Sequence, residues 1–309
     1  PHTPFAPVAE VNEATGTEGQ MIEALQGAGA RICVTHLAPL TERILGACPD
    51  LELFCISRGG PVNANLEAAT RHGVAVTFAP GRNATATAEH TLALILAAAR
   101  GVADVHTDLK RGIWRGDYFD YDRCGIEIEG STVGLIGYGA VGSRVAKALA
   151  AMGANILVHD PYTDPAALTA IGAEQVSLDD LLTRSRIVSL HARVTDETRG
   201  MIGRKELALM PKGSVLVNCA RGALMDYAAA QDALASGHLA AAGFDVFDEE
   251  PPPADSPLLT TPGVVLTPHI AGGSREVAHK AARIVAGEVA RFLKGEPLAH
   301  CANPEVLVS

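Results

Sequence analysis

STVGLIGYGAVGSRVAKAL, residues 131–149, contains an apolar run, then three glycines, then a segment with the periodicity of an amphipathic helix. The glycines are Gly137, Gly139 and Gly142, in the spacing G-x-G-x-x-G. In a strand–turn–helix unit the first glycine permits a tight turn, the second lets the backbone approach a pyrophosphate, and the third allows close helix–strand packing. The start of the helix would add free backbone amides. The stretch therefore predicts a βαβ unit with a phosphate-binding turn.

An acid at the end of the next apolar run extends this prediction. Asp160 follows residues 156–158 and lies 18 residues after Gly142. An acid at that point accepts hydrogen bonds from the ribose hydroxyls of an adenosine, and its charge repels a 2'-phosphate. The glycines alone could form an ordinary turn, and Asp160 before Pro161 could simply close another. In combination they predict a site for NAD, preferred over NADP.

Apolar runs alternate with amphipathic stretches along the chain, which is typical of βαβ units and parallel sheets, so the predicted fold class is α/β. Six runs after residue 131 fit a Rossmann-type doubly wound cofactor domain, and three earlier runs fit a smaller flavodoxin-like sheet. The expected strands are residues 31–34, 51–55, 74–77, 132–136, 155–159, 187–191, 214–218, 241–246 and 264–267.

Two helices and a polar crossover predict the domain boundaries. An alanine-rich helix near residues 85–100 leads into a polar stretch over 101–129, and a long helical pattern follows Gly273. We expect the last segment to return to the first domain, which makes that domain discontinuous. The predicted parts are a substrate domain in residues 1–102, an NAD-binding domain in 103–274, and a crossover helix and tail in 275–309.

The composition argues against nucleic-acid-binding, membrane-spanning and zinc-binding proteins. The 309 residues carry a net charge of −10, which argues against nucleic-acid binding driven by clustered cations. No apolar run approaches the roughly 20 residues of a membrane span, so we expect a soluble protein. The six cysteines form no CxxC pair and no Cys/His spacing of a zinc site, so no metal is expected. With no secretion signal at the start, cytoplasmic residence is the expectation.

Three residues in the second half follow apolar runs and could carry chemistry. Arg221 follows VLVN, Glu250 lies 29 residues later in DVFDEEP, and His269 lies 19 further on in LTPHIAGG. Taken singly, each could be an ordinary loop residue. At successive strand ends they would supply a cation for a carboxylate and an acid/base pair for a hydroxyl proton. The set predicts hydride transfer between a hydroxy acid and nicotinamide.

Several motifs together resemble the D-isomer-specific 2-hydroxyacid dehydrogenase family, which includes phosphoglycerate dehydrogenases and glyoxylate/hydroxypyruvate reductases. The resemblance covers most of the chain. The motifs are VGLIGYGAVG (133–142), HDPY (159–162), the run with His191, Thr195 and Thr198, VNCARG (217–222), DVFDEEP (245–251) and TPHIAGG (267–273).

The resemblance implies a role for each matching residue. His269 becomes the general acid/base, Glu250 its partner, and Arg221 the anchor of the substrate's carboxylate and 2-oxo group. The implied cofactor-binding residues are Gly137, Gly139, Ala140, Val141, Gly142, Asp160, His191, Thr195, Cys219, Ala220, Asp245, Thr87 and Gly272. The implied substrate-binding residues are Arg58, Gly59, Gly60, Arg82 and Asn83.

Two arginines and one further departure distinguish this chain. Arg58 and Arg82 stand in loops where the family often has uncharged residues, which favours a substrate with a second anionic or hydroxyl-rich end. A structural brace for the loop is the alternative. Arg193 replaces the family's usual proline and leaves the adenosine side less defined.

The sequence leaves two function classes open. The main prediction is an NAD-dependent D-2-hydroxyacid dehydrogenase acting on a small 2-hydroxy or 2-oxo acid. The alternative is an NADH-binding regulatory scaffold, because co-repressors with this fold retain the same three residues. A formate dehydrogenase is less compatible, since those enzymes have glutamine where Glu250 stands. The family and the crossover carrying Trp114 predict a homodimer.

Overall fold

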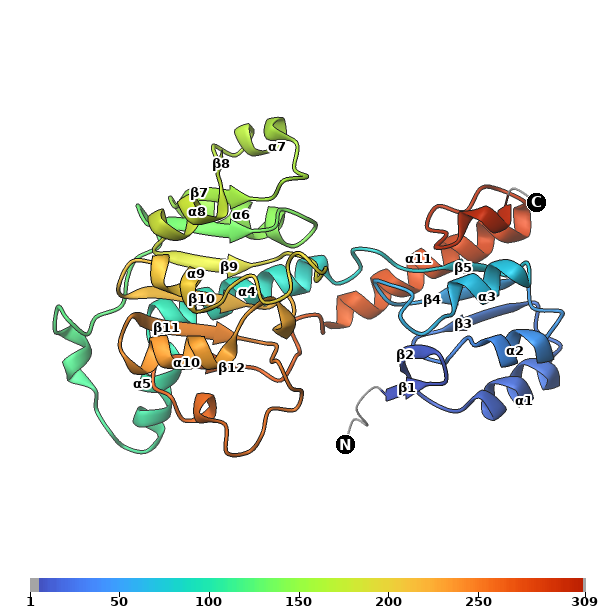
Figure 1. The fold of residues 1–309 in the computed structure, drawn as a ribbon, viewed down its shortest axis with the longest axis horizontal. Coiled ribbons are helices and arrows are strands. Elements are labelled where there is room, and N and C mark those ends of the chain that lie inside the picture. The colour runs from blue at the N-terminus through green and yellow to red at the C-terminus, as the bar shows by residue number, and fades with distance from the viewer. Residues whose placement is uncertain (1–5, 308–309) are drawn as a thin grey trace. The chain divides into compact units, whose positions relative to one another are not determined.

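The computed structural model describes residues 6–307 and divides into two compact units (Figure 1). Unit 1 comprises the chain up to Asn83 together with the chain from Ser274 onward, and unit 2 comprises residues 84–273. The first unit is therefore discontinuous in sequence. Within residues 6–307, no helix is both long enough and apolar enough to cross a membrane.

Unit 2 is built on a seven-stranded parallel sheet in the order β12-β11-β10-β9-β6-β7-β8. The order reverses between β6 and β9, which makes it a doubly wound sheet of Rossmann type. Its strands are β6 (Thr132–Ile136), β7 (Asn155–His159), β8 (Glu174–Gln175), β9 (Ile187–Leu190), β10 (Ser214–Asn218), β11 (Leu239–Phe244) and β12 (Val264–Leu266). The sequence predicts six of them. It misses β8, whose two residues are polar and exposed and give no hydrophobic pattern.

Helices cover both faces of this sheet because its central strands are buried on both sides. The helices are α4 (Ala84–Ala99), α6 (Gly142–Ala151), α7 (Pro165–Thr169), α8 (Leu178–Arg184), α9 (Arg204–Leu209) and α10 (Tyr227–Ala235). One core contains Ile95 of α4 and Val145 of α6, together with Leu168 of α7. The other contains Leu181 of α8 and Ala230 of α10, as well as residues of α9.

The first domain boundary lies earlier than the sequence predicts. We expected residues 1–102 in the first domain, whereas unit 1 ends at Asn83 and α4 belongs to unit 2. The reason is packing: α4 contributes Leu94 and Ile95 to a core shared with β10 and β11. Gly243 of β11 allows this close approach, because a Cβ atom there would lie 3.0 Å from the Cβ of Leu94.

Unit 1 holds a three-stranded parallel sheet, β3-β4-β5, between two helical layers. Its elements are β3 (Ile32–Thr35), β4 (Leu53–Ile56), β5 (Ala75–Thr77), α1 (Glu18–Ala28), α2 (Glu42–Ala47), α3 (Leu66–Arg71) and α11 (Arg275–Lys294). The helices α1 to α3 share one core with the sheet, and α11 covers the other face through Val285. Buried Asn303 fixes the tail after α11, since its side chain bonds the backbone of Val74 and Val76.

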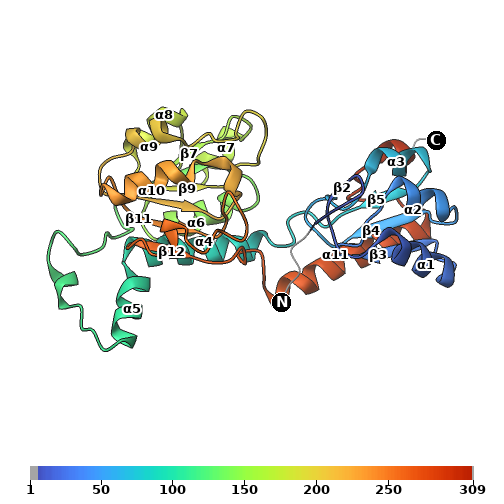
Figure 2. The same ribbon diagram turned by 60° about the horizontal axis from the view of Figure 1, so that its bottom comes forward.

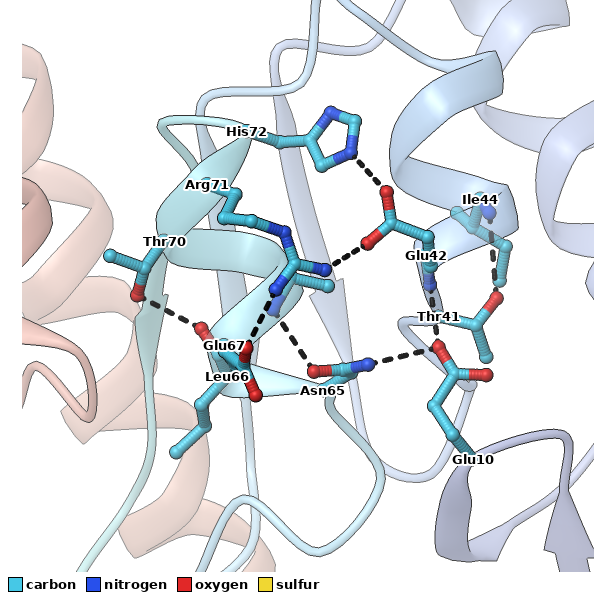
Figure 3. Close-up of polar contacts among 11 residues, drawn as sticks. Glu10, Thr41, Glu42, Ile44, Asn65, Leu66, Glu67, Thr70, Arg71 and His72 are labelled. Atoms are coloured by element: carbon cyan, nitrogen blue, oxygen red, sulfur yellow. Dashed lines mark hydrogen bonds and ion pairs between the residues drawn. The ribbon is translucent and has the colours of Figure 1, made fainter.

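A polar network ties the start of the described chain to two helices of unit 1 (Figure 3). The antiparallel strands β1 (Ala6–Val8) and β2 (Val11–Ala14) flank Glu10. The Glu10 carboxylate accepts hydrogen bonds from the Glu42 backbone N–H at the start of α2 and from the Asn65 side chain before α3. Glu42 in turn pairs with His72 and Arg71. This network closes the outer side of α2 and α3.

A long excursion leaves the body of unit 2 between α4 and β6, and both ribbon views show it standing off the sheet (Figures 1 and 2). It contains α5 (Val102–Lys110), which has no buried residue, and the short helix η1 (Gly116–Phe119). Trp114 is 83% exposed and Phe119 is 96% exposed. Large apolar side chains on such a segment lack a covering element within unit 2.

Candidate active site

The carboxyl ends of six parallel strands in unit 2 bring the predicted site residues to one edge of the sheet. In sheet order, His269 follows β12, Glu250 follows β11, Arg221 follows β10 and His191 follows β9. The glycine turn follows β6, and Asp160 follows β7. Ligands of doubly wound sheets bind at this edge, beside the point where the strand order reverses.

The glycine turn has the geometry that a pyrophosphate needs. Gly137 has φ +100°, and a Cβ atom there would lie 2.7 Å from the backbone of His191. At Gly142 a Cβ atom would lie 2.2 Å from the Gly137 carbonyl oxygen, so no side chain fits. At Gly139 a Cβ atom would meet nothing within 4 Å. The turn is thus closed on its protein side and open where a phosphate would approach, at the start of α6.

Asp160 shapes this turn as well as ending β7. Its carboxylate accepts hydrogen bonds from the backbone N–H of Tyr138, at 2.7 Å, and of Tyr162, at 2.9 Å. The first bond fixes the residue between two glycines of the turn. A carboxylate has about four acceptor positions, so these bonds leave capacity for ribose hydroxyls. The residues present therefore fit an adenosine dinucleotide.

His269 and Glu250 form a direct pair. His269 Nδ1 lies 2.6 Å from Glu250 Oε2, and the other carboxylate oxygen accepts from the Phe247 N–H at 2.9 Å. A carboxylate can only accept, so Nδ1 carries the proton and Nε2 is left for an external group. The side chains are 47% and 36% exposed, so the pair can reach a small molecule.

The loop that carries His269 is held by a buried carboxylate. His269 has φ +53°, a backbone conformation that costs about 1 kcal/mol or more in a non-glycine residue. Asp245, 1% exposed, accepts from the N–H groups of Ile270 and Ala271, both at 2.8 Å. Its own carbonyl accepts from the His269 N–H at 2.8 Å. These bonds impose the strained conformation and direct the imidazole.

Two residues of this network were not predicted from the sequence. Thr267 Oγ1 donates to Asp245 at 2.6 Å, and His90 Nε2 on α4 lies 2.9 Å from Thr267 Oγ1. Thr267 belongs to the TPHIAGG motif, and this position in the sequence could have indicated that it lies near His269. His90 lies on a helix that looks like a purely structural alanine-rich segment, and nothing in the local pattern connects it to residue 267.

Arg221 extends from the loop after β10, which packs against the loop that carries Glu250. A Cβ atom at Gly222 would lie 1.7 Å from the Phe247 carbonyl oxygen, so glycine is required for this approach. Buried Asn218 donates to the Arg221 carbonyl at 3.0 Å and to Tyr227 Oη at 3.2 Å. Arg221 itself is exposed, and no carboxylate within residues 6–307 forms an ion pair with it.

The remaining predicted cofactor residues lie along the same edge or next to it. His191 lies against the glycine turn, and burial lowers the pKa of its imidazole to about 4. Thr195 closes an exposed turn with Thr198. Cys219 is buried, which raises the pKa of its thiol to about 12 and keeps the thiol protonated. The others are Ala140 and Val141 before α6, Ala220 after β10, Gly272 in the His269 loop and Thr87 on the buried side of α4.

The predicted substrate-binding residues belong to unit 1. Arg58, Gly59 and Gly60 follow β4, and Arg82 and Asn83 follow β5. The two loops are joined by a hydrogen bond of 2.7 Å from the Ala79 N–H to the Arg58 carbonyl. They therefore lie at the carboxyl edge of the unit 1 sheet.

Comparisons with known proteins agree with this arrangement. Residues 92–271 match the D-isomer specific 2-hydroxyacid dehydrogenase, NAD binding domain. The chain is 40% identical over 272 residues to D-3-phosphoglycerate dehydrogenase of Mycobacterium leprae, a match covering 88% of this chain and 51% of that protein. It is 41% identical over 275 residues to glyoxylate reductase of Aeropyrum pernix, covering 87% and 82% of the two chains.

A solved structure of a D-lactate dehydrogenase has a similar fold. The crystal structure of D-lactate dehydrogenase with NAD+ from Lactobacillus jensenii is similar with a TM-score of 0.83, at 25% identity, over 94% of this chain and 91% of that one. The chain spans about half the length of the phosphoglycerate dehydrogenases that it matches and most of the glyoxylate reductase. The NAD-binding domain that the glycine turn predicts is therefore present, and the chain belongs to the D-isomer specific 2-hydroxyacid dehydrogenase family.

Proposed function

We propose that this protein is an NAD-dependent oxidoreductase that interconverts a D-2-hydroxy acid and its 2-oxo acid. The observation that carries the proposal is the 2.6 Å contact between His269 Nδ1 and Glu250 Oε2 at the same sheet edge as the glycine turn. It supports an acid/base pair on the domain that binds the dinucleotide. The nicotinamide supplies or accepts the hydride when bound.

The proton is assigned to His269 Nε2. With Nδ1–H donating to Glu250, neutral His269 presents a lone pair at Nε2 that can take the proton of a 2-hydroxyl group. In the reverse direction the imidazolium returns that proton to the oxygen of the 2-oxo group. Glu250 fixes the ring orientation and balances the positive charge that forms.

Arg221 is assigned to the substrate's carboxylate and 2-oxo group. The support is its exposure and the absence, within the described part of the chain, of an ion pair that would compete for it. A guanidinium binds a carboxylate through two parallel hydrogen bonds, which also orients the adjacent carbon. We propose Arg58, Gly59, Gly60, Arg82 and Asn83 as further substrate-binding residues.

The remaining cofactor contacts are proposed from position and chemistry. Ala140 and Val141, at the start of α6, would present backbone N–H groups to the pyrophosphate. Asp160 would bind the adenosine ribose, which favours NAD over NADP. The residues proposed around the rest of the dinucleotide are Thr87, His191, Thr195, Cys219, Ala220, Asp245 and Gly272.

The direct test is a panel of 2-oxo acids supplied with NADH, with oxidation of NADH as the measurement. We expect turnover of at least one small 2-oxo acid and formation of the D-hydroxy acid. A regulatory scaffold would bind NADH tightly and reduce none of them. The relatives reported above are named as dehydrogenases and reductases, which does not favour that alternative.

We also propose a homodimer formed through the excursion after α4. Its support is a group of large apolar side chains that are at least 48% exposed and a hollow of about 260 Å3 between α5 and Trp114. These side chains are Val102, Leu109, Ile113, Trp114, Phe119 and Tyr121. Sedimentation should give a dimer for the native chain and a monomer for Trp114→Glu. Leu293→Glu, at an exposed apolar position of unit 1, is the matched control and should stay dimeric.

A reducing, cytoplasmic setting is proposed on the thiol chemistry. All six cysteines are free, and burial raises the pKa of Cys33 and Cys55 to about 11. A chain of this kind gains nothing from an oxidising compartment. Fractionation of the native cells with an antibody to the chain would test the assignment, and recovery outside the cytoplasm would contradict it.

A further inference from the structure

A histidine of α4 begins a chain of three side chains that ends at the buried acid of unit 2. His90 Nε2 lies 2.9 Å from Thr267 Oγ1, which in turn lies 2.6 Å from Asp245 Oδ1. The Asp245 side chain is 1% exposed and that of His90 is 22% exposed. All three residues belong to unit 2, in which α4 packs against β11 and β12. The chemistry assigned above to His269 and Glu250 makes no use of His90.

The number of protons available fixes the direction of both hydrogen bonds. Asp245 accepts from the backbone N–H of Ile270 at Oδ1 and of Ala271 at Oδ2, as an ionised carboxylate does. A carboxylate can only accept, so the Thr267 hydroxyl gives its single proton to Asp245. The hydroxyl oxygen can then only accept from the imidazole, so His90 carries a proton at Nε2. The chain therefore donates from His90 to Thr267 and from Thr267 to Asp245.

This chain reaches the loop that carries His269 through the orientation of one carboxylate. The Asp245 carboxylate is held by the Thr267 hydroxyl on one side and by two N–H groups of the His269 loop on the other. The position of the carboxylate and the conformation of the loop therefore depend on each other. His90 Nε2 lies 3.6 Å from Asp245 Oδ1, too far for a direct hydrogen bond, so Thr267 is the connection. Hydrogen bonds in series strengthen one another, so donation by His90 makes Thr267 a stronger donor.

We propose that His90 is a positioning residue for proton transfer, which acts through Thr267 and Asp245 on the loop that carries His269. This inference rests on the proposed function and adds to it a residue of α4, outside the three predicted catalytic residues. The competing explanation is a hydrogen bond that only stabilises the packing of α4 against β12. The two explanations differ in what they predict for kcat, for a second donor at residue 90 and for the imidazole of His269.

The kinetic test compares two substitutions of His90 with a matched control. His90→Leu removes the donor and should lower kcat about fivefold, or about 1 kcal/mol, the contribution of one hydrogen bond, with KM nearly unchanged. His90→Gln should recover most of this loss, because its amide nitrogen is as many bonds from Cβ as the imidazole Nε2. His238→Leu is the control, since His238 Nε2 also lies 2.9 Å from an acceptor, the Leu207 carbonyl, at the amino end of β11. It should lower the Tm as His90→Leu does and leave kcat unchanged.

A double variant tests whether the effect passes through Thr267. If His90 acts through the hydroxyl, His90→Leu combined with Thr267→Val should lower kcat no further than Thr267→Val alone. Three kinetic results would overturn the positioning role: independent, multiplying losses in the double variant, a His90→Gln variant no better than His90→Leu, or an equal loss of kcat in His238→Leu. The last would show that kcat follows general stability.

NMR spectra of the cofactor-free chain keep this inference distinct from the proposed function. At about pH 8.5, where a histidine of ordinary pKa is neutral, proton–nitrogen correlation spectra should show His90 with its proton at Nε2. The signals of His90 are assigned by their loss in His90→Gln. A proton at Nδ1 alone would contradict the chain, because Nε2 would then have no proton to donate to Thr267.

The same spectra report on His269 without any turnover. His90→Leu should shift the ring signals of His269, whereas His238→Leu should leave them in place. If no 2-oxo acid is reduced but this shift is found, the dehydrogenase proposal fails and the coupling of His90 to the His269 loop stands. If 2-oxo acids are reduced and neither kcat nor the His269 signals respond to His90→Leu, the positioning role fails.

Discussion

The two units differ in how the charged side chains at the carboxyl edges of their parallel sheets are paired. At the carboxyl edge of the unit 2 sheet, the Asp245 carboxylate is satisfied by three donors and Glu250 is paired with His269. At the same edge of the unit 1 sheet, Glu13 balances one of two arginines and Arg82 Nε has no partner within the described chain. The two carboxylates of the unit 2 edge are thus satisfied by donors of their own unit, whereas Arg82 Nε of the unit 1 edge is an unused donor.

The difference separates two tasks that a dehydrogenase must perform. Proton transfer needs groups whose orientation is already fixed, because the reacting atoms must meet with small error. Recognition of charge needs donors that the protein has not already paired, because the ligand must supply the missing acceptor. We infer that the His269–Glu250 pair of unit 2 fits the first task, whereas Arg221 of unit 2 and Arg82 of unit 1 fit the second.

The largest effect should come from breaking the unit 2 pair. Removal of the imidazole in His269→Ala leaves no group to exchange the hydroxyl proton, so kcat should fall by about a thousandfold or more. The Kd for NADH should change little, because the glycine turn and Asp160 lie after other strands. Stopped-flow and equilibrium fluorescence titration measure the two quantities. Near-native turnover would remove His269 from the mechanism.

The second largest effect should come from Asp160, which follows β7 at the carboxyl edge of the unit 2 sheet. Replacing Asp160 with Ser removes the charge that repels a 2'-phosphate while keeping a hydrogen-bonding group, so the ratio of kcat/KM for NADH over NADPH should fall about tenfold or more. The variant also loses the bonds to Tyr138 and Tyr162, so use of NADH itself should weaken. Asp164→Ser, at a nearby helix cap, is the control. A native chain that uses NADPH equally well would contradict the assignment.

Much of the fold followed from short-range patterns. The predicted limits of β6, β7 and β10 are those observed, and the final helix begins at the expected residue, Arg275. These elements have strong hydrophobic runs or clear caps such as Ser274 and Gly295. The assignment of α4 to unit 2 did not follow, because alanine-rich helices give little indication of which sheet they cover.

The positions of the candidate site residues were predictable where a residue follows a strand, but contacts between distant elements were not. His269, Glu250 and Arg221 stand in recognisable motifs directly after apolar runs. The contacts of His90 with Thr267 and of Tyr227 with Asn218 join positions 177 and 9 residues apart, and no local periodicity encodes them.

A third prediction tests whether the buried network of Asp245, Thr267 and His90 holds the loop that carries His269. Thr267→Val keeps the shape of the side chain but removes the 2.6 Å donor to Asp245 and the 2.9 Å contact of His90 with residue 267. We expect the free energy of unfolding to fall by about 1–2 kcal/mol and kcat to fall about tenfold, with KM nearly unchanged. Thr267→Ser restores the hydroxyl and should recover kcat. If Val and Ser behave alike, the hydroxyl does not position His269.

The smallest effect should come from a histidine that the chemistry does not use. Burial lowers the pKa of His191 from 6.5 to about 4, so the folded chain holds it neutral while the unfolded chain takes up a proton as the pH falls through 6.5. Because the unfolded state then binds more protons, stability is full above that pH and is lost progressively toward about pH 4. Full burial would give about 3 kcal/mol, and the partial exposure of His191 reduces the expected loss to about 1 kcal/mol.

Urea unfolding at about pH 7 and about pH 5 measures this loss. His191→Gln cannot titrate, so its stability should fall less between the two pH values than that of the native chain. His106→Gln, at an exposed position of α5, is the control and should keep the native pH dependence. An unchanged pH dependence in His191→Gln would mean that the residue is solvated in the folded chain. His191 would then offer the cofactor an imidazole that can carry charge, and the unit 2 edge would be less self-contained than its hydrogen bonds indicate.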